Sequence, residues 1–170
     1  MYRLLLTLLL ALSLPIAAEE VRELTWSEMV PEQAKGQNTQ PAPVMHDLSQ
    51  LSDVLSEANS PAAAQQSPAA PVVKALDGQS VKLPGYIVPI EMDEDGKVSE
   101  FLLVPYFGAC IHVPPPPSNQ IVLVRYPDGV LLDELYQPFW IEGPLQVQAA
   151  SSELAEAGYQ MSAARVYPYE

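Results

Sequence analysis

Apolar and polar positions in the second half of the chain follow the period of β-strands more than that of helices. Turn signals separate the apolar runs, among them Asp77-Gly78-Gln79-Ser80 and Pro127-Asp128-Gly129. Glycines inside two of the runs, Gly85 and Gly143, indicate sharp bends in the strands. The main runs lie at 72–76, 81–90, 98–107, 119–126, 138–148 and 159–169.

Five or six strands of uneven length would leave unpaired edges in an open sheet, whereas a closed barrel removes those edges. The LDGQSVKLPG pattern and the two glycine bends favour a barrel of the OB type. We therefore predict a mainly β domain over 72–170, a small closed or partly closed OB-like barrel. A β-sandwich is the alternative fold.

Two segments have features of helices. In Met45–Ala58 the apolar residues fall on one side of a helix, and Asn59-Ser60-Pro61 ends it, which predicts an N-terminal amphipathic helix. Ser151–Ala157 is predicted as one short helix, with a serine cap at its start and Gly158 after its end.

Residues 19–71 form an N-terminal arm before the barrel. Trp26 is expected to anchor this arm on the domain, because it is a large apolar side chain in a polar stretch. The segment Ser60–Pro71, SPAAAQQSPAAP, is of low complexity and predicts a poorly ordered, flexible linker.

Residues 1–18 have the pattern of a secretory signal peptide. Arg3 precedes the apolar run Leu4–Leu14, and small residues end at Ala18 before two glutamates. This run of eleven mostly apolar residues is too short to cross a hydrocarbon core of about 30 Å as a helix. We expect cleavage after Ala18, release into the periplasm and no stable membrane insertion afterwards; a retained anchor is the alternative.

The charge of the chain limits its partners. With 21 acidic and 8 basic residues, its net charge is −13, so nucleic acid is a poor partner. The single cysteine, Cys110, cannot form an internal disulfide. It is therefore buried and inert, protected by a ligand, or paired with another chain.

Cys110 lies in the most unusual stretch, FLLVPYFGACIHVPPPPSNQIVLVRY, residues 101–126. If Cys110-Ile111-His112 is extended, the thiol and the imidazole share a face, with their Cα atoms about 6.5–7 Å apart. Prolines 114–117 follow and predict a stiff polyproline II wall.

Cys110 and His112 are suitable ligands for Zn²⁺ or copper, but two ligands make only half of a tetrahedral site. The remaining ligands could come from the helix or from the acidic run after 90: His46, Glu91, Asp93, Glu94 and Asp95. Alternatively, Cys110 and His112 only pack in the core, and the acidic run is a solvated turn.

A thiol enzyme or redox protein is a second hypothesis for Cys110. A Cys–His pair needs a third group to orient the imidazole, and within the stretch Asn119 is the nearest candidate, across the prolines. The chain is therefore more consistent with a binding protein than with an enzyme. A protein-docking surface could use Tyr106, Asn119 and the proline run Pro114, Pro115, Pro116 and Pro117.

The run GACIHVPPPPSNQIV, with LDGQSVKLPGYIVPIE before it and AGYQMSAARVYPY after it, resembles the domain of unknown function 3299 family over about residues 20–169. The resemblance implies a small exported envelope protein of Gram-negative bacteria, often encoded near ABC-type export or metal-uptake machinery. We therefore expect a periplasmic accessory protein that serves an envelope transport system and binds a soft metal, with a structural interaction module as an alternative.

Overall fold

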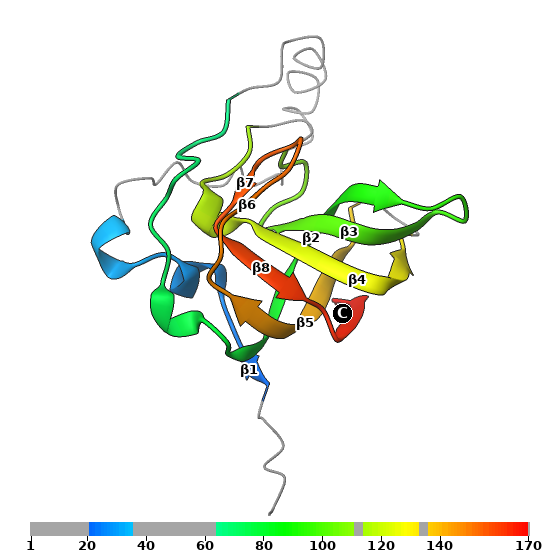
Figure 1. The fold of residues 1–170 in the computed structure, drawn as a ribbon, viewed down its shortest axis with the longest axis horizontal. Coiled ribbons are helices and arrows are strands. Elements are labelled where there is room, and N and C mark those ends of the chain that lie inside the picture. Colours follow the sequence, from blue (N-terminus) through cyan, green and yellow to red (C-terminus); the bar gives the residue numbers. More distant parts are fainter. Residues whose placement is uncertain (1–20, 36–63, 111–113, 133–135, 170) are drawn as a thin grey trace, which may run out of the picture.

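Five strands close into a barrel (Figure 1): β2 (Ser80–Met92), β3 (Lys97–Val104), β4 (Val122–Leu131), β5 (Pro138–Gln146) and β8 (Tyr159–Ser162). The structure is a computed structural model that describes residues 21–35, 64–110, 114–132 and 136–169. The order around the barrel is β2-β3-β4-β8-β5 and back to β2. β4 and β8 are parallel and the other neighbours are antiparallel. This is the strand arrangement of an OB-type barrel, which confirms the predicted fold class.

Short elements surround the barrel. β1 (Arg22–Glu23) pairs with β2, β9 (Arg165–Pro168) pairs with β5, and β6 (Ala150–Ser151) pairs with β7 (Glu156–Ala157) in a separate hairpin. The helices of the described residues are single 3₁₀ turns: η1 (Trp26–Met29), η2 (Glu32–Ala34), η5 (Lys74–Leu76) and η6 (Ser118–Gln120). The predicted signal peptide and the predicted helix Met45–Ala58 lie outside the described residues.

The prediction of a short helix over Ser151–Ala157 is wrong, because this segment is the β6–β7 hairpin. The hydroxyl of Ser152 accepts hydrogen bonds from the backbone N–H groups of Leu154 and Ala155, at 3.3 and 3.1 Å, and donates to the carbonyl of Ala155 at 2.8 Å. Serine side chains cap helices and close turns by the same local hydrogen bonds, so the sequence signal was ambiguous.

β2 bends at Gly85, as predicted. Its first half pairs with β5 and its second half with β3, so Tyr86 is opposite both Pro138 and Val104. A Cβ atom on Gly85 would lie 2.7 Å from the carbonyl oxygen of Val104, which is closer than such atoms can approach. Only glycine therefore allows one strand to serve two neighbours here.

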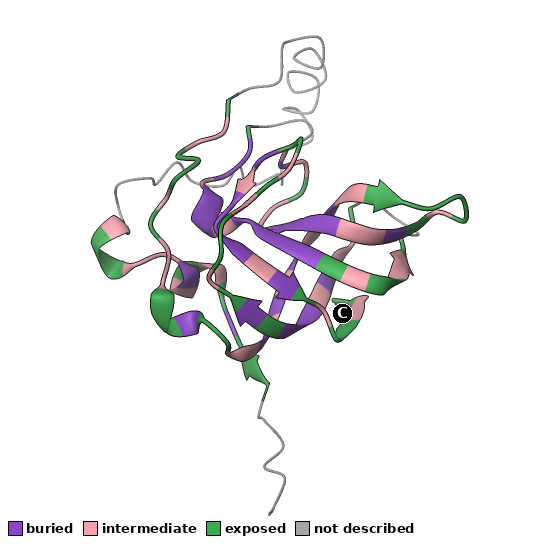
Figure 2. Ribbon diagram, in the orientation of Figure 1, coloured by how far each residue is buried: buried purple, intermediate pink, exposed green. Residues whose placement is uncertain are grey.

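The second half of β3, residues 101–104, and the start of β4 are buried on both faces (Figure 2). Phe101 and Leu103 point into the barrel, and Leu102 and Val104 point outward into a second apolar cluster. A strand that is buried on both sides has a continuous apolar run and no alternation. This explains why the sequence from 101 to 104 lacks the two-residue period of a half-exposed strand.

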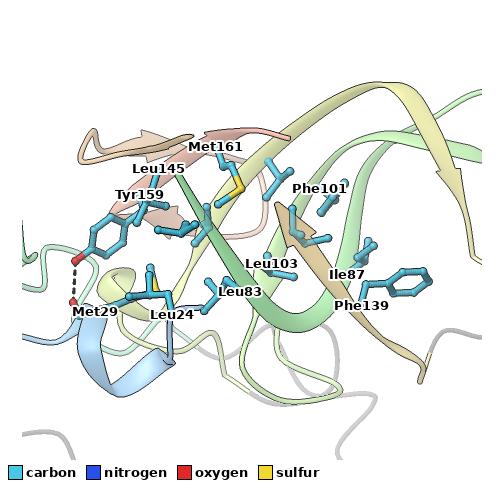
Figure 3. Packing of buried hydrophobic residues seen from close by; sticks show 14 of the residues in the cluster. Leu24, Met29, Leu83, Ile87, Phe101, Leu103, Phe139, Leu145, Tyr159 and Met161 are labelled. Carbon is cyan, nitrogen blue, oxygen red and sulfur yellow. Dashed lines mark hydrogen bonds between the residues drawn. The ribbon is translucent and has the colours of Figure 1, made fainter. Parts of the chain in front are cut away.

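The N-terminal arm fills one end of the barrel (Figure 3). Leu24 and Met29 are fully buried in the barrel core, and the indole N–H of Trp26 donates to the carbonyl of Pro84 at 2.6 Å. The hydroxyl of Tyr159, which is also buried, donates to the carbonyl of Met29 at 2.7 Å and accepts from the backbone N–H of Val73 at 2.8 Å. Trp26 therefore anchors the arm as predicted, and Tyr159 ties arm, barrel and the entry to β2 together.

The substitution Tyr159→Phe should lower the free energy of unfolding by about 1–3 kcal/mol, because it leaves a buried carbonyl and a part-buried N–H without their partner. Urea unfolding monitored by circular dichroism measures this loss. Tyr169→Phe is the matched control, since the Tyr169 side chain is exposed and its hydroxyl has no hydrogen-bond partner among the described residues. The control should change stability by less than about 0.5 kcal/mol; equal losses in the two variants would contradict the role assigned to Tyr159.

Candidate functional site

The segment between β3 and β4 carries the residues that the sequence singled out. Its described parts, 105–110 and 114–121, fold over the outer faces of β2, β3 and β4, together with the β6–β7 hairpin. Between these layers lies the outer apolar cluster, which consists of Val88, Leu102, Val104, Ala109, Ile121, Leu123, Ala155 and Ala157. The candidate site is thus built on a rigid strand surface that the chain itself covers.

Cys110 does not have the extended backbone that the sequence analysis assumed. Its φ is +68°, in the left-handed region, and Gly108 two residues earlier has φ +80°. The segment therefore turns at Cys110, and the predicted alternation of side chains with His112 does not apply at this residue. His112 itself lies outside the described residues.

The Cys110 side chain is half-buried and packs against the outer apolar cluster. Burial raises the pKa of its thiol to about 11, because the apolar surroundings disfavour the thiolate. The pKa of the neighbouring Tyr106 is also raised, first by burial and then by the proximity of Cys110. At neutral pH the thiol is therefore protonated and a weak nucleophile.

The proline run is a wall, as predicted, but much of it is covered. Pro115 and Pro116 are buried, while Pro114 is exposed. Pro117 has the backbone of a polyproline II helix, with φ −52° and ψ 147°. The carbonyl of Pro115 accepts from the backbone N–H of Gln66 at 3.2 Å, so this face of the run is already occupied.

This face is covered by the segment that we call the strap, residues 64–71, which are the last eight of the twelve residues of the predicted linker. Gln65 donates from its amide to the carbonyls of Pro116 and Glu156, at 3.0 and 2.7 Å, and accepts from the N–H of Glu156 at 2.8 Å. The amide of Asn119, which is buried, donates to the carbonyl of Pro71 at 2.8 Å. The expectation of a poorly ordered linker is therefore wrong for residues 64–71, while residues 60–63 lie outside the described part.

The role of Gln65 is not apparent from the sequence alone. Composition marked the segment as low complexity, and alanine and proline dominate it. The one signal against a flexible linker is the pair Gln65 and Gln66, whose amide side chains lie between the two stretches rich in alanine and proline. The identity of their partners depends on contacts with residues up to 91 positions away, which no local pattern reports.

The acidic candidates lie at the tip of the β2–β3 hairpin, which projects from the barrel (Figure 1). Glu91, Asp93, Glu94 and Asp95 are all exposed. The carboxylate of Asp93 accepts from the backbone N–H groups of Asp95 and Lys97, at 3.0 and 2.8 Å, and so closes the turn. Within the described ranges, no three His, Cys, Asp or Glu side chains are close enough together to hold a metal. His46 and His112 are not in those ranges.

Four side chains form what we call the aromatic rim: Tyr86, Tyr106, Phe107 and Pro114. The rings of Tyr86 and Phe107 pack edge to face with their centroids 6.0 Å apart, and Phe107 remains 36% exposed. The hydroxyl of Tyr106 lies 3.5 Å from the carbonyl of Pro114. The rim presents apolar surface on a rigid base, which suits contact with a partner more than chemistry.

Comparison with known proteins identifies a family and a similar solved structure. The family model described as a protein of unknown function, DUF3299, matches residues 26–168. A crystal structure of a DUF3299 family protein from Pseudomonas aeruginosa is similar to this chain, with 62% sequence identity and a TM-score of 0.71. The similarity covers 89% of this chain and 97% of that one. No curated protein matches the chain significantly.

Cys110 should react slowly with iodoacetamide at pH 8, and its rate should rise about tenfold per pH unit toward pH 11, because only the thiolate attacks. The rate is measured by mass spectrometry of the alkylated protein. The same chain unfolded in urea is the control, and its thiol should react with the pKa of a free cysteine, about 8.5. Fast alkylation of the folded protein at pH 7 would contradict the assigned environment.

Proposed function

This chain belongs to the DUF3299 family, and from that premise we propose that it is a binding module of the bacterial envelope that docks on a protein of a transport system through the aromatic rim. The supporting observation is a cluster of aromatic side chains in which Phe107 is exposed while Tyr86 and Tyr106 are half-buried against the outer apolar cluster. Tyrosine and phenylalanine are enriched at protein interfaces, where they bury large areas at little entropic cost.

The environment of Cys110 supports binding over catalysis. A nucleophilic cysteine needs a lowered pKa or an adjacent base, whereas burial raises the pKa of this thiol to about 11. Hydrogen bonds from the strap hold the proline run against the barrel, so the rim needs little ordering when a partner binds. Preorganised surfaces of this kind lose less entropy on association.

The periplasmic location and the transport system are part of this proposal. The first is supported by the signal-like pattern of residues 1–18, and the second by the family resemblance. N-terminal sequencing of protein recovered from the periplasm should begin at Glu19 or within two residues of it. In the described part of the chain, no helix is long and apolar enough to cross a membrane.

A photoreactive phenylalanine analogue in place of Phe107 should form, in intact cells, a cross-link to a protein of an envelope transporter. Irradiation followed by mass spectrometry of the adduct identifies the partner. The matched control carries the analogue at Met92, which is 65% exposed at the hairpin tip and away from the rim. The proposal fails if position 107 gives no adduct, or if both positions give the same set of adducts.

Metal binding at Cys110 is the second candidate function. The observation that favours it is the left-handed backbone of Cys110, one of two such non-glycine residues in the described ranges, the other being Ser67. Strained backbone of this kind gathers at functional sites, because the surrounding structure must hold it in place. In this candidate Cys110 and His112 bind Zn²⁺ or Cu⁺, with further ligands outside the described residues or from a partner.

Calorimetric titration with Zn²⁺ and Cu⁺ tests the metal candidate. The metal must displace the thiol proton, so affinity should rise about tenfold per pH unit between pH 7.5 and 9.5, below the thiol pKa of about 11. Cys110→Ser should abolish binding, and His112→Ala should weaken it at least tenfold, or about 1.4 kcal/mol. Absence of heat and of thermal stabilisation in the unchanged protein would exclude this candidate.

A further inference from the structure

A second aromatic surface lies on the outside of β2, β5 and β9, away from the barrel interior. Direct strand pairing places Pro84 opposite Trp140, and Trp140 opposite Tyr167. In the next row the backbone N–H of Tyr169 donates to the carbonyl of Pro138 at 2.9 Å. Directly paired residues point to the same side of a sheet, so these side chains share one surface. We call it the aromatic face: Pro84, Pro138, Trp140, Tyr167 and Tyr169.

A row of alternating charges borders the aromatic face. Lys82 is opposite Glu142, and Glu142 is opposite Arg165. Lys82 also pairs with Glu23 of β1 at 3.1 Å, and Arg165 pairs with Glu142 at 3.2 Å. The chain as a whole carries a net charge of −13. This surface is locally balanced, so it can approach a partner without the repulsion that the rest of the molecule exerts.

Two hydrogen-bond donors on the aromatic face are unused. The indole N–H of Trp140 and the hydroxyl of Tyr169 have no acceptor among the described residues, whereas the hydroxyl of Tyr167 donates to Glu142 at 2.6 Å. A ligand for this face should therefore carry carbonyl acceptors. A polyproline II peptide fits this requirement, because its backbone carbonyls have no internal partners.

The molecule already uses this chemistry within itself. The indole N–H of Trp26 donates to the carbonyl of Pro84 at 2.6 Å. The aromatic rings of proline-recognition surfaces likewise contact proline rings while their N–H and O–H groups bind carbonyls. The aromatic face offers the same combination to a second molecule.

The ring geometry favours such a peptide over a glycan. The rings of Trp140 and Tyr169 have centroids 5.0 Å apart and are tilted by 35°. The ammonium group of Lys82 lies 4.6 Å from the Trp140 ring centroid and covers part of that ring. A sugar ring stacks on a flat, open aromatic face, which this arrangement does not provide. The tilted rings of Trp140 and Tyr169 can contact the small ring of a proline, and the N–H and O–H groups of these two side chains can donate to its carbonyl.

A partner could instead pair a strand with the edge of β9, but this mode of binding suits the structure less well than contact with the aromatic face. β9 is four residues long, and Pro168 has no N–H to donate. Short length and proline both protect a sheet edge from pairing. Recognition by side chains on the face therefore fits the residues better than recognition by the strand edge.

From these observations we propose that the aromatic face binds a proline-rich segment of a partner protein in the polyproline II conformation, with Trp140 and Tyr169 as donors to its carbonyls. The aromatic face adjoins the aromatic rim, since Tyr86 of the rim is paired with Pro138 of the face. The inference uses other side chains, Trp140 and Tyr169, and does not depend on the function proposed for the rim.

Titration of the full chain with a blocked decaproline peptide, followed by ¹H–¹⁵N NMR, tests this inference. The chain has two tryptophans, Trp26 and Trp140, so two indole signals are expected and Trp140→Phe assigns them. The Trp140 signal should shift saturably at micromolar to millimolar peptide, and the Trp26 signal should move less. Tyr169→Ala should weaken binding at least tenfold.

Phe107→Ala is the control that separates the two surfaces, because it removes an exposed ring of the aromatic rim and leaves the aromatic face intact. It should change decaproline affinity less than twofold, with both variants shown to be folded by their thermal transitions. Three results would overturn the inference: no shift of Trp140 at millimolar peptide, binding that Phe107→Ala abolishes and Tyr169→Ala does not, or a Trp140 shift with chitohexaose in place of decaproline.

Discussion

Burial of the second half of β3, residues 101–104, on both faces is the constraint on which the rest of the structure depends. Leu103 and Phe101 complete the barrel interior, while Leu102 and Val104 need a second cover outside it. Residues 105–110 and 114–121 provide that cover together with the β6–β7 hairpin, and the side chains that they add to the outer apolar cluster are mostly small, such as Ala109 and Ala157. In the OB fold, strands in this position form the usual ligand surface. Here the chain itself covers that surface, and the binding surface that we propose, the aromatic rim, lies at its margin.

The chemistry of Cys110 follows from the same constraint. The thiol lies at the border of the outer cluster, where it is partly withdrawn from water and its pKa is raised to about 11. A protonated thiol in a left-handed turn is poorly suited to nucleophilic attack at neutral pH. It is compatible with a binding surface, and also with a metal ligand that loses its proton only when the metal binds.

The two aromatic surfaces are linked through β2. Tyr86 belongs to the aromatic rim, and it is opposite Pro138 of the aromatic face across the β2–β5 pairing. The bend at Gly85 allows this, because it turns one strand from β5 toward β3. Aromatic and proline side chains thus run over the outside of an acidic protein, in a region where the carboxylates Glu23 and Glu142 are paired with cations.

The sequence by itself determined the barrel, the bend at Gly85, the anchoring by Trp26 and the polyproline II backbone of Pro117, because strand period, large apolar side chains, glycine and proline act through local sterics and burial. Only the tertiary structure decided that Ser152 closes a hairpin instead of capping a helix, that Cys110 turns, and that Gln65 binds Glu156. Those outcomes depend on which distant groups compete for the same hydrogen bonds and apolar cover, and local patterns contain no information about that competition.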